Sequence, residues 1–335
     1  MKILQTSDVL VGRDFRELPE LAEELRQARL DVLSSLVALA EKERVEALVL
    51  VGNTLADNRI SHRTLMDVSR LLGASSVPVL ILPGETDPLT PDSPYELRAD
   101  LFQEPVRVLR KSEPVELKSG LTFYPCPITR REGTSDLSWI PPRGSDTGLR
   151  VGLAVGDPPA SHGLDYLALG GSLDRQESYS GTPEPVDYEG DSGSALVVEL
   201  VPLKVHPVKV ARWSWQSVEL EVGSPPSLQH PGGRNVLLRV RLTGSLPEDE
   251  LGKLDKELER LASRCRHLSV INEVGVAAPV GYRHPLLQRM AASLQTRAAA
   301  VTVDPGELPE SSEVAREALV LLRKLIARSG QEDLR

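Results

Sequence analysis

Oxygen-bearing side chains follow each of the first three apolar runs of the chain. Asp8 follows the first run, Asn53 the second, and Glu85 and Asp87 the third. Short apolar runs of this kind read as buried strands, and in open α/β sheets ligands gather outside the carboxyl ends of the strands. Carboxylate and amide oxygens are the ligands that Mg²⁺ and Ca²⁺ prefer. These four residues could therefore gather one weakly bound hard cation; the alternative is that they only cap turns and helix ends.

Other catalytic signatures are missing from the sequence. The six histidines are scattered, and there is no P-loop, dinucleotide fingerprint or nucleophile elbow. Cys126 and Cys265 have no metal-type spacing and are expected to be reduced thiols. No apolar stretch approaches the roughly 18 to 20 residues of a membrane span, and the N-terminus turns polar too soon for a signal peptide. We therefore expect a cytoplasmic protein that does not enter membranes.

The elements that must position these side chains follow an α/β pattern. Leu21, Leu25, Val32 and Leu36 recur at helical spacing, and Ser61 can cap a second helix. The pattern predicts strands at residues 2–8, 45–53, 77–83, 106–109, 114–117, 121–124, 150–156, 166–169, 194–201, 205–210 and 218–222. At 335 residues the chain is long enough for two domains.

The most specific motif lies at residues 165–185. An apolar run at 166–169 ends in Gly170-Gly171, and the sequence Tyr-Ser-Gly-Thr-Pro-Glu follows at 179–184. This segment resembles the last motif of the calcineurin-like metallophosphoesterases in their SbcD/YhaO DNA-exonuclease form. There the strand ends in Gly-His-x-His, and a Tyr-x-Gly-Thr-Pro-Glu segment follows. Gly171 and Leu173 occupy the two histidine positions here.

Earlier blocks resemble the same family in the same order. Asp8 lies in a segment similar to Ser-Asp-x-His-x-Gly, Asn53 in one similar to Gly-Asp-x-x-Asp, and Glu85 in one similar to Gly-Asn-His-Asp. The strand at 150–156 resembles one that ends in a metal-binding histidine, at the position of Val155. The strands at 194–201, 205–210 and 218–222 resemble those that close the second sheet of the family. The resemblance implies an α/β fold: a four-layer αββα metallophosphoesterase sandwich with a small C-terminal α+β capping domain.

The ligand set that the family uses is largely missing. Its enzymes hold two cations roughly 3.5–4 Å apart, which activate a water and stabilise the charge that develops on phosphate. By the resemblance the seven ligand positions are Asp8, Leu10, Asn53, Glu85, Val155, Gly171 and Leu173, and the general-acid position is Thr86, followed by Asp87. Four of the seven have no donor atom. We expect no catalytic residue and no dinuclear centre, with at most one weakly bound Mg²⁺ or Ca²⁺ as cofactor.

The predicted domains follow the same resemblance. Residues 1–222 form the metallophosphoesterase-like domain, and the Gly- and Pro-rich residues 223–234 form a linker. Residues 235–300 form the capping domain, in which a βαβ unit is expected. Residues 301–335 form a C-terminal tail with one helix.

Basic residues concentrate in the capping region although the net charge of the chain is −9. Residues 230–300 hold 11 Lys and Arg against 7 Asp and Glu. DNA phosphates are one ligand for such a surface, and a solvated helix surface is the alternative. The candidate DNA contacts are Arg239, Arg241, Arg260, Arg264 and Arg266. Because the rest of the chain is acidic, we expect any DNA binding to be weak.

Three functions remain open from the sequence. The first is a catalytically silent SbcD-like nuclease homologue that acts as a scaffold or a DNA-processing accessory subunit. The resemblance implies an SbcC-like coiled-coil ATPase as its partner, bound by the helix near residues 314–325; a core-packing role fits the same helix. The second is an active phosphodiesterase or nuclease with a rebuilt metal centre. The third is an interaction module with no DNA role. A homodimer is compatible with all three.

Overall fold

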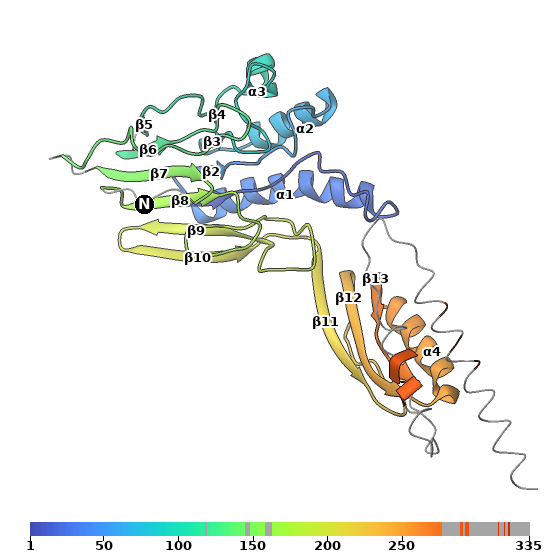
Figure 1. Cartoon of the computed structure of the whole chain (residues 1–335). Coiled ribbons are helices and arrows are strands. Elements are labelled where there is room, and N and C mark those ends of the chain that lie inside the picture. Colours follow the sequence, from blue (N-terminus) through green and yellow to red (C-terminus); the bar gives the residue numbers. More distant parts are fainter. Residues whose placement is uncertain are drawn as a thin grey trace, which may run out of the picture. The chain divides into compact units, whose positions relative to one another are not determined.

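The computed structural model describes residues 1–117, 119–144, 148–157, 163–276, 289–290, 292–294, 314, 318 and 321. The chain divides into two units, Met1–Ser214 and Trp215–Arg335 (Figure 1), and each is described by itself. The predicted tail at 301–335 and the end of the predicted capping domain, beyond residue 276, lie outside the described residues apart from those isolated positions.

A six-stranded sheet forms the centre of the first unit. Its strands are β1 (Lys2–Thr6), β2 (Ala47–Val51), β3 (Val79–Leu82), β4 (Val106–Val108), β9 (Ser194–Leu200) and β10 (Leu203–Lys209). The order is β10-β9-β1-β2-β3-β4. The first four strands are parallel, and β9 pairs antiparallel with both β1 and β10. The carboxyl ends of β1, β2 and β3 therefore share one edge.

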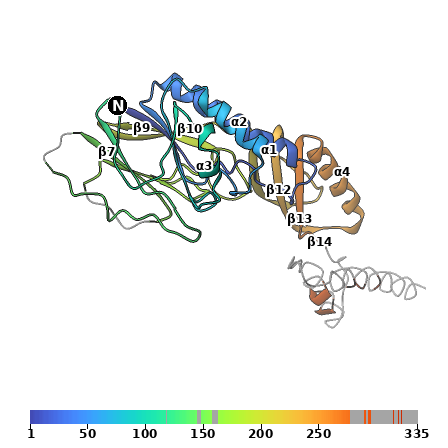
Figure 2. The same ribbon diagram turned by 90° about the horizontal axis from the view of Figure 1, so that it is seen from above.

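Strand alternation sends buried side chains of this sheet to two separate cores. On one face, Leu48 and Leu50 of β2 pack with the helices α1 (Ala22–Glu43) and α2 (His62–Gly73), which lie side by side (Figure 2). On the other face, Val49 packs against a second sheet. Because both faces of β2 are covered, the strand is apolar throughout, as is typical of buried parallel strands.

The second sheet has the order β5-β6-β7-β8. Its strands are β5 (Val115–Glu116), β6 (Leu121–Pro125), β7 (Leu149–Val155) and β8 (Tyr166–Gly170). Phe123, Leu153 and Ala168 face the first sheet. The outer face is covered by Leu137 and Ile140, which belong to a loop.

The α/β class and the two stacked sheets are confirmed. The expected fourth layer was a layer of helices on the outer face of the second sheet. In the described residues, the loop that contains Leu137 and Ile140 covers this face instead.

The helices of the first unit follow local sequence signals. Leu25, Val32 and Leu36 of α1 are buried, as their spacing predicts. Ser61 caps α2, since its Oγ accepts a hydrogen bond from the Thr64 amide at 3.1 Å. A short helix α3 (Pro94–Leu97) and a 3₁₀ turn η1 (Ala99–Leu101) follow β3. None of the helices in the described parts of the chain is long and apolar enough to cross a membrane.

The second unit contains the predicted βαβ arrangement. Its elements are β11 (Ser214–Val222), β12 (Gly233–Leu246), η2 (Glu248–Glu250), α4 (Leu251–Ala262), β13 (Cys265–Asn272) and β14 (Gly275–Val276). β12 and β13 pair in parallel, and α4 connects them and packs on their sheet (Figure 1). Leu254 and Leu261 of α4 contribute to its core.

Three strand assignments and one boundary differ from the expectation. The strands at 194–201 and 205–210, expected in the second sheet, extend the first sheet beside β1 as β9 and β10. The strand at 218–222, expected in the first domain, pairs with β12 as part of β11. The boundary therefore follows Ser214 and not residue 222, and residues 223–232 connect two strands of one sheet instead of two domains. Alternation of side chains identifies a strand but not its partner.

Candidate functional site

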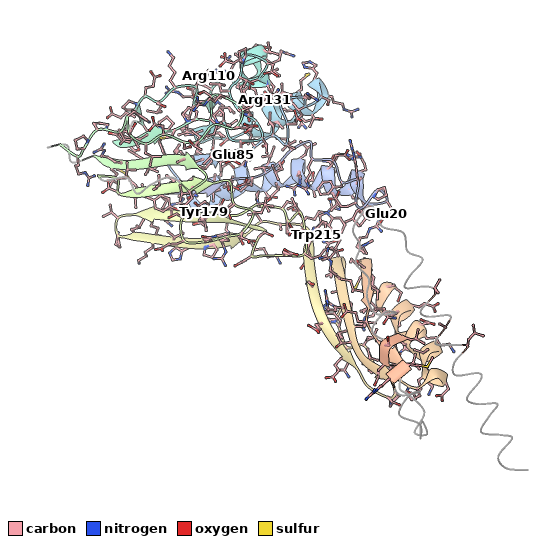
Figure 3. All side chains as sticks on the ribbon, in the orientation of Figure 1. Glu20, Glu85, Arg110, Arg131, Tyr179 and Trp215 are labelled. Atoms are coloured by element: carbon pink, nitrogen blue, oxygen red, sulfur yellow. The ribbon has the colours of Figure 1, made fainter. Side chains whose placement is uncertain are left out.

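An open pocket of about 720 Å³ lies at the carboxyl ends of β1 and β2. It is lined by Asp8, Leu10, Val11, Gly12, Arg13, Asp14, Asn53, Ala56, Asp57, Arg59, Ile60, Thr86, Gly171 and Leu173. Five of the seven ligand positions and the general-acid position thus meet here. Glu85 lines an adjoining hollow of about 210 Å³ with Arg59, Thr86 and Arg131 (Glu85 and Arg131 are labelled in Figure 3).

Strained turns at the strand ends place the pocket residues. Asp8, Leu10 and Asn53 have φ values of +53°, +53° and +55°, a region that residues other than glycine rarely adopt. Backbone hydrogen bonds hold the turns: the Asp8 amide donates to Gly52 O at 3.1 Å, and the Leu10 amide donates to Asn53 O at 3.0 Å. Strain of this kind persists only where the surroundings enforce it, and it clusters at functional sites.

The polar floor of the pocket is a closed hydrogen-bond network. Asn53 Nδ2 donates to Asp8 Oδ1 at 2.7 Å, and the Gly171 amide donates to Asp8 Oδ2 at 3.0 Å. Asn53 Oδ1 in turn accepts from the Thr86 amide at 3.0 Å. Burial raises the pKa of Asp8 to about 6, although these hydrogen bonds oppose the shift. Both carboxylate oxygens of Asp8 are therefore engaged within the chain.

Asp87 supports the floor from behind. Its fully buried carboxylate accepts hydrogen bonds from the amides of Asn53, Leu55 and Gly84 at 3.1, 2.9 and 2.8 Å, and from Tyr95 Oη at 2.8 Å. Burial raises the pKa of Asp87, and the hydrogen bonds partly offset it. Asp87 thus caps backbone amides of two turns, which is the alternative to binding a cation.

An apolar side chain fills the space beside the network. Val155 is 3% exposed and lies between two glycines. A Cβ atom at Gly52 would lie 2.5 Å from Val155 Cγ2, and one at Gly171 would lie 3.0 Å from Val155 Cγ1. Gly171 also has a φ of +88°, which strains any other residue. Leu173, 37% exposed, lies at the rim.

Two buried charged residues near the site were missed by the sequence reasoning. Burial lowers the pKa of Arg29 to about 9 and raises that of Glu184 to about 7. Arg29 donates to Val9 O at 2.5 Å and to Glu184 O at 2.9 Å. The Glu184 carboxylate accepts from the amides of Arg212 and Trp213 at 2.8 and 2.9 Å. The sequence did carry one signal for the burial of Arg29: this charged residue lies on the apolar face of the first helix.

The structure brings together some of the oxygen ligands expected for a hard cation. Asp8 and Asn53 are in contact, Asp87 bonds the Asn53 amide, and Glu85 is exposed. In the described part of the chain, no group of three or more His, Cys, Asp and Glu residues is placed to hold a metal ion. One weakly bound Mg²⁺ or Ca²⁺ stays a prediction.

The five arginines predicted to contact DNA lie in different parts of the second unit. Arg239 and Arg241 alternate along β12 with core residues, so they lie on the sheet face opposite α4. Arg241 pairs with Glu273 at 2.9 Å, and Arg260, on α4, pairs with Glu257 at 2.6 Å.

The other two lie where the chain enters β13. Arg264 donates to Pro231 O at 2.9 Å, and Arg266 is exposed at the start of β13. The five arginines are thus divided between the two faces of the sheet and the turn after α4. DNA binding by these residues stays a prediction.

Comparison with known proteins finds likeness to solved structures. No protein-family model matches the chain, and no curated protein matches it. Among solved structures, the chain is similar to the crystal structure of TT1561 of Thermus thermophilus, with 13% sequence identity and a TM-score of 0.40. The likeness covers 62% of this chain and 98% of that chain.

Proposed function

We propose that this protein is a metallophosphoesterase-like protein of the SbcD type whose hydrolytic centre has been lost, and that it acts by binding. The observation that carries the proposal is the hydrogen bonding of the Asp8 carboxylate. Asp8 is the one ligand position that keeps its residue type, and both its oxygens accept hydrogen bonds from within the chain. These two hydrogen bonds use part of the acceptor capacity of the carboxylate, and among the described residues no second carboxylate of the pocket floor faces the same point to complete a cation site.

The remaining donors also fit a dinuclear centre poorly. Neutral Asn53 cannot offset two dications as a bridging carboxylate does, and its own oxygen accepts from Thr86. Val155 and Leu173 offer no donor atom, and Gly171 has no side chain. Without imidazoles, the site lacks the ligands that favour zinc.

The role we propose is that of a scaffold or accessory subunit in DNA processing, with an SbcC-like coiled-coil ATPase as partner. Its support is the sequence resemblance: the order of the blocks, the Gly-Thr-Pro-Glu segment and the βαβ unit in the second domain. The helix expected to bind the ATPase, near residues 314–325, lies almost wholly outside the described residues.

Metal analysis tests the loss of the centre. After loading with Mn²⁺ and desalting, elemental analysis should find well under one ion per chain, because four ligand positions lack donors. No phosphodiesterase or nuclease activity should appear on single-stranded DNA, double-stranded DNA or model esters. Two retained ions, with activity that disappears in an Asp8→Ala, Asn53→Ala double variant, would favour the rebuilt metal centre instead.

DNA binding tests the proposed role. We expect weak binding that falls steeply with salt and shows little sequence preference, because only phosphate contacts are available. Reversing Arg239 and Arg266 to Glu should weaken binding and flatten the salt dependence, while Asp8→Ala should do neither. Filter binding across a salt series measures both. If no DNA binds at low salt, the interaction module without a DNA role becomes the better interpretation.

A further inference from the structure

The first unit passes into the second through a short segment that a buried carboxylate holds. Residues 210–213 form this joining segment between β10 and β11, and the boundary between the units follows Ser214. Glu184 Oε2 accepts a hydrogen bond from the Arg212 amide at 2.8 Å, and Glu184 Oε1 accepts one from the Trp213 amide at 2.9 Å. The two oxygens of one carboxylate thus bind two consecutive amides of the joining segment.

The joining segment also forms a turn and an exposed ion pair. The Val210 and Ala211 amides donate to Gly193 O at 3.0 and 3.1 Å. Arg212 Nη1 pairs with Asp31 at 3.2 Å, and because both side chains are about half exposed, this pair contributes little to stability. The carboxylate that binds the next two amides is therefore the buried anchor of the segment.

The Glu184 carboxylate is buried without an ion pair. Its residue is 1% exposed, and among the described residues the carboxylate bonds only to the two amides. Taking a carboxylate out of water without an opposite charge in contact is costly, and the uptake of a proton relieves this cost.

The charged groups around the carboxylate offset only part of the cost. Arg29 of α1 and Arg212 of the joining segment both favour the charged form. However, the Arg29 guanidinium donates to three backbone carbonyl oxygens, and that of Arg212 pairs with Asp31. Farther away, Asp8 and Arg13 act on Arg29 in opposite directions. The charge of the carboxylate therefore stays largely uncompensated.

Opening of the joining segment would return the carboxylate to water. With the segment closed, burial raises the pKa of Glu184 from 4.5 to about 7, while the amide hydrogen bonds and the two arginines limit the shift. Between these two pH values the closed segment therefore binds more protons than the open segment. The preference for the closed form is greatest below about pH 4.5 and decreases until the pH has risen past about 7.

We infer that Glu184 is a pH-sensitive clamp on the joining segment, which holds the segment closed in acid and releases it more often as the pH rises past neutrality. The clamp acts where the chain leaves the first unit, so its opening frees the residues that lead into β11. The inference does not depend on the proposed function, because Glu184 does not line the pocket at the carboxyl ends of β1 and β2.

Hydrogen exchange of the full chain, followed by mass spectrometry between about pH 5.5 and about pH 8.5, tests the inference. After correction for the intrinsic exchange rate at each pH, protection of the Arg212 and Trp213 amides should fall on the order of tenfold or more across this range. In Glu184→Gln the protection should be lower in acid, because the NH₂ group opposes one amide, and nearly constant with pH, because glutamine takes up no proton. Glu189→Gln, at an exposed position between β8 and β9, is the matched control and should keep the wild-type profile.

Three results would overturn the inference. The first is protection of the Arg212 and Trp213 amides that does not change with pH in the wild type. The second is a profile as steep in Glu184→Gln as in the wild type. The third is protection equal at every pH to that of the Leu48 amide, which donates to Pro78 O at 2.9 Å in the core. Equal protection would mean that the two amides exchange only when the whole first unit unfolds. The wild-type series decides this point even if the glutamine variant does not fold.

Discussion

Folding moves the carboxylate of Glu184 from water into an interior where it is 1% exposed. Burial raises its pKa from 4.5 to about 7, while hydrogen bonds from the Arg212 and Trp213 amides and the charge of Arg29 limit the shift. Between those two pH values the folded chain therefore binds more protons than the unfolded chain. Stability must then fall as the pH rises through this range, which is the opposite of a carboxylate in a salt bridge.

A Glu184→Gln variant should lose that pH dependence. The wild type should lose roughly 3 kcal/mol of unfolding free energy between about pH 4.5 and about pH 7.5 through this residue. The variant should show a flatter profile but lose about 1 kcal/mol at acid pH, because its NH₂ group opposes one of the two amides. Urea unfolding across the range measures both. The exposed Glu113→Gln is the control, and a profile that stays as steep in Glu184→Gln as in wild type would contradict the prediction.

At the scale of helices and strands, the sequence predicted the elements whose formation depends on the local pattern of apolar and capping residues. The helical spacing of Leu25 and Leu36 and the capping residue Ser61 identified α1 and α2, and apolar runs identified the strands. The pairing of β9 with β1 and of β11 with β12 was not predictable, because alternation does not encode a partner.

Prediction from the sequence has the same limit at the candidate site. The meeting of Asp8 and Asn53 follows from parallel strands that share an edge, and the sequence predicted it. The burial of Arg29 against Glu184 depends on segments 155 residues apart in the chain. Local sequence carries no signal for such a contact beyond the unusual position of a charge on an apolar helix face.

The close approach of β8 to β2 gives a test at this scale. A Cβ atom at Gly170 would lie 1.7 Å from the Val51 carbonyl oxygen, and backbone cannot rotate away as a side chain can. Gly170→Ala should therefore destabilise the protein by about 3 kcal/mol or more. Gly73→Ala is the matched control, since nothing lies within 4 Å of its added methyl group. Equal melting temperatures for the two variants would show that β8 is not held against β2.

At the scale of the whole molecule, the division after Ser214 predicts where the chain can be cut. A fragment of residues 1–214 retains both sheets of the first unit and the Glu184 contacts to Arg212 and Trp213. A fragment of residues 1–222 also carries β11 without its partner β12 and exposes an unpaired strand edge. We expect the shorter fragment to elute as a single species in size-exclusion chromatography and the longer one to self-associate. The reverse order would place the boundary after residue 222.

The packing of Val155 between Gly52 and Gly171 also limits how a histidine pair could be introduced by successive point mutations. A histidine introduced first at residue 171 would meet Val155 at 3.0 Å and the Gly156 amide nitrogen at 3.1 Å, in a backbone conformation with a φ of +88°. Replacing Val155 first would remove a buried side chain from the core between the sheets. Each first step is destabilising and neither provides a ligand pair. Histidines at residues 155 and 171 would therefore have to be introduced together.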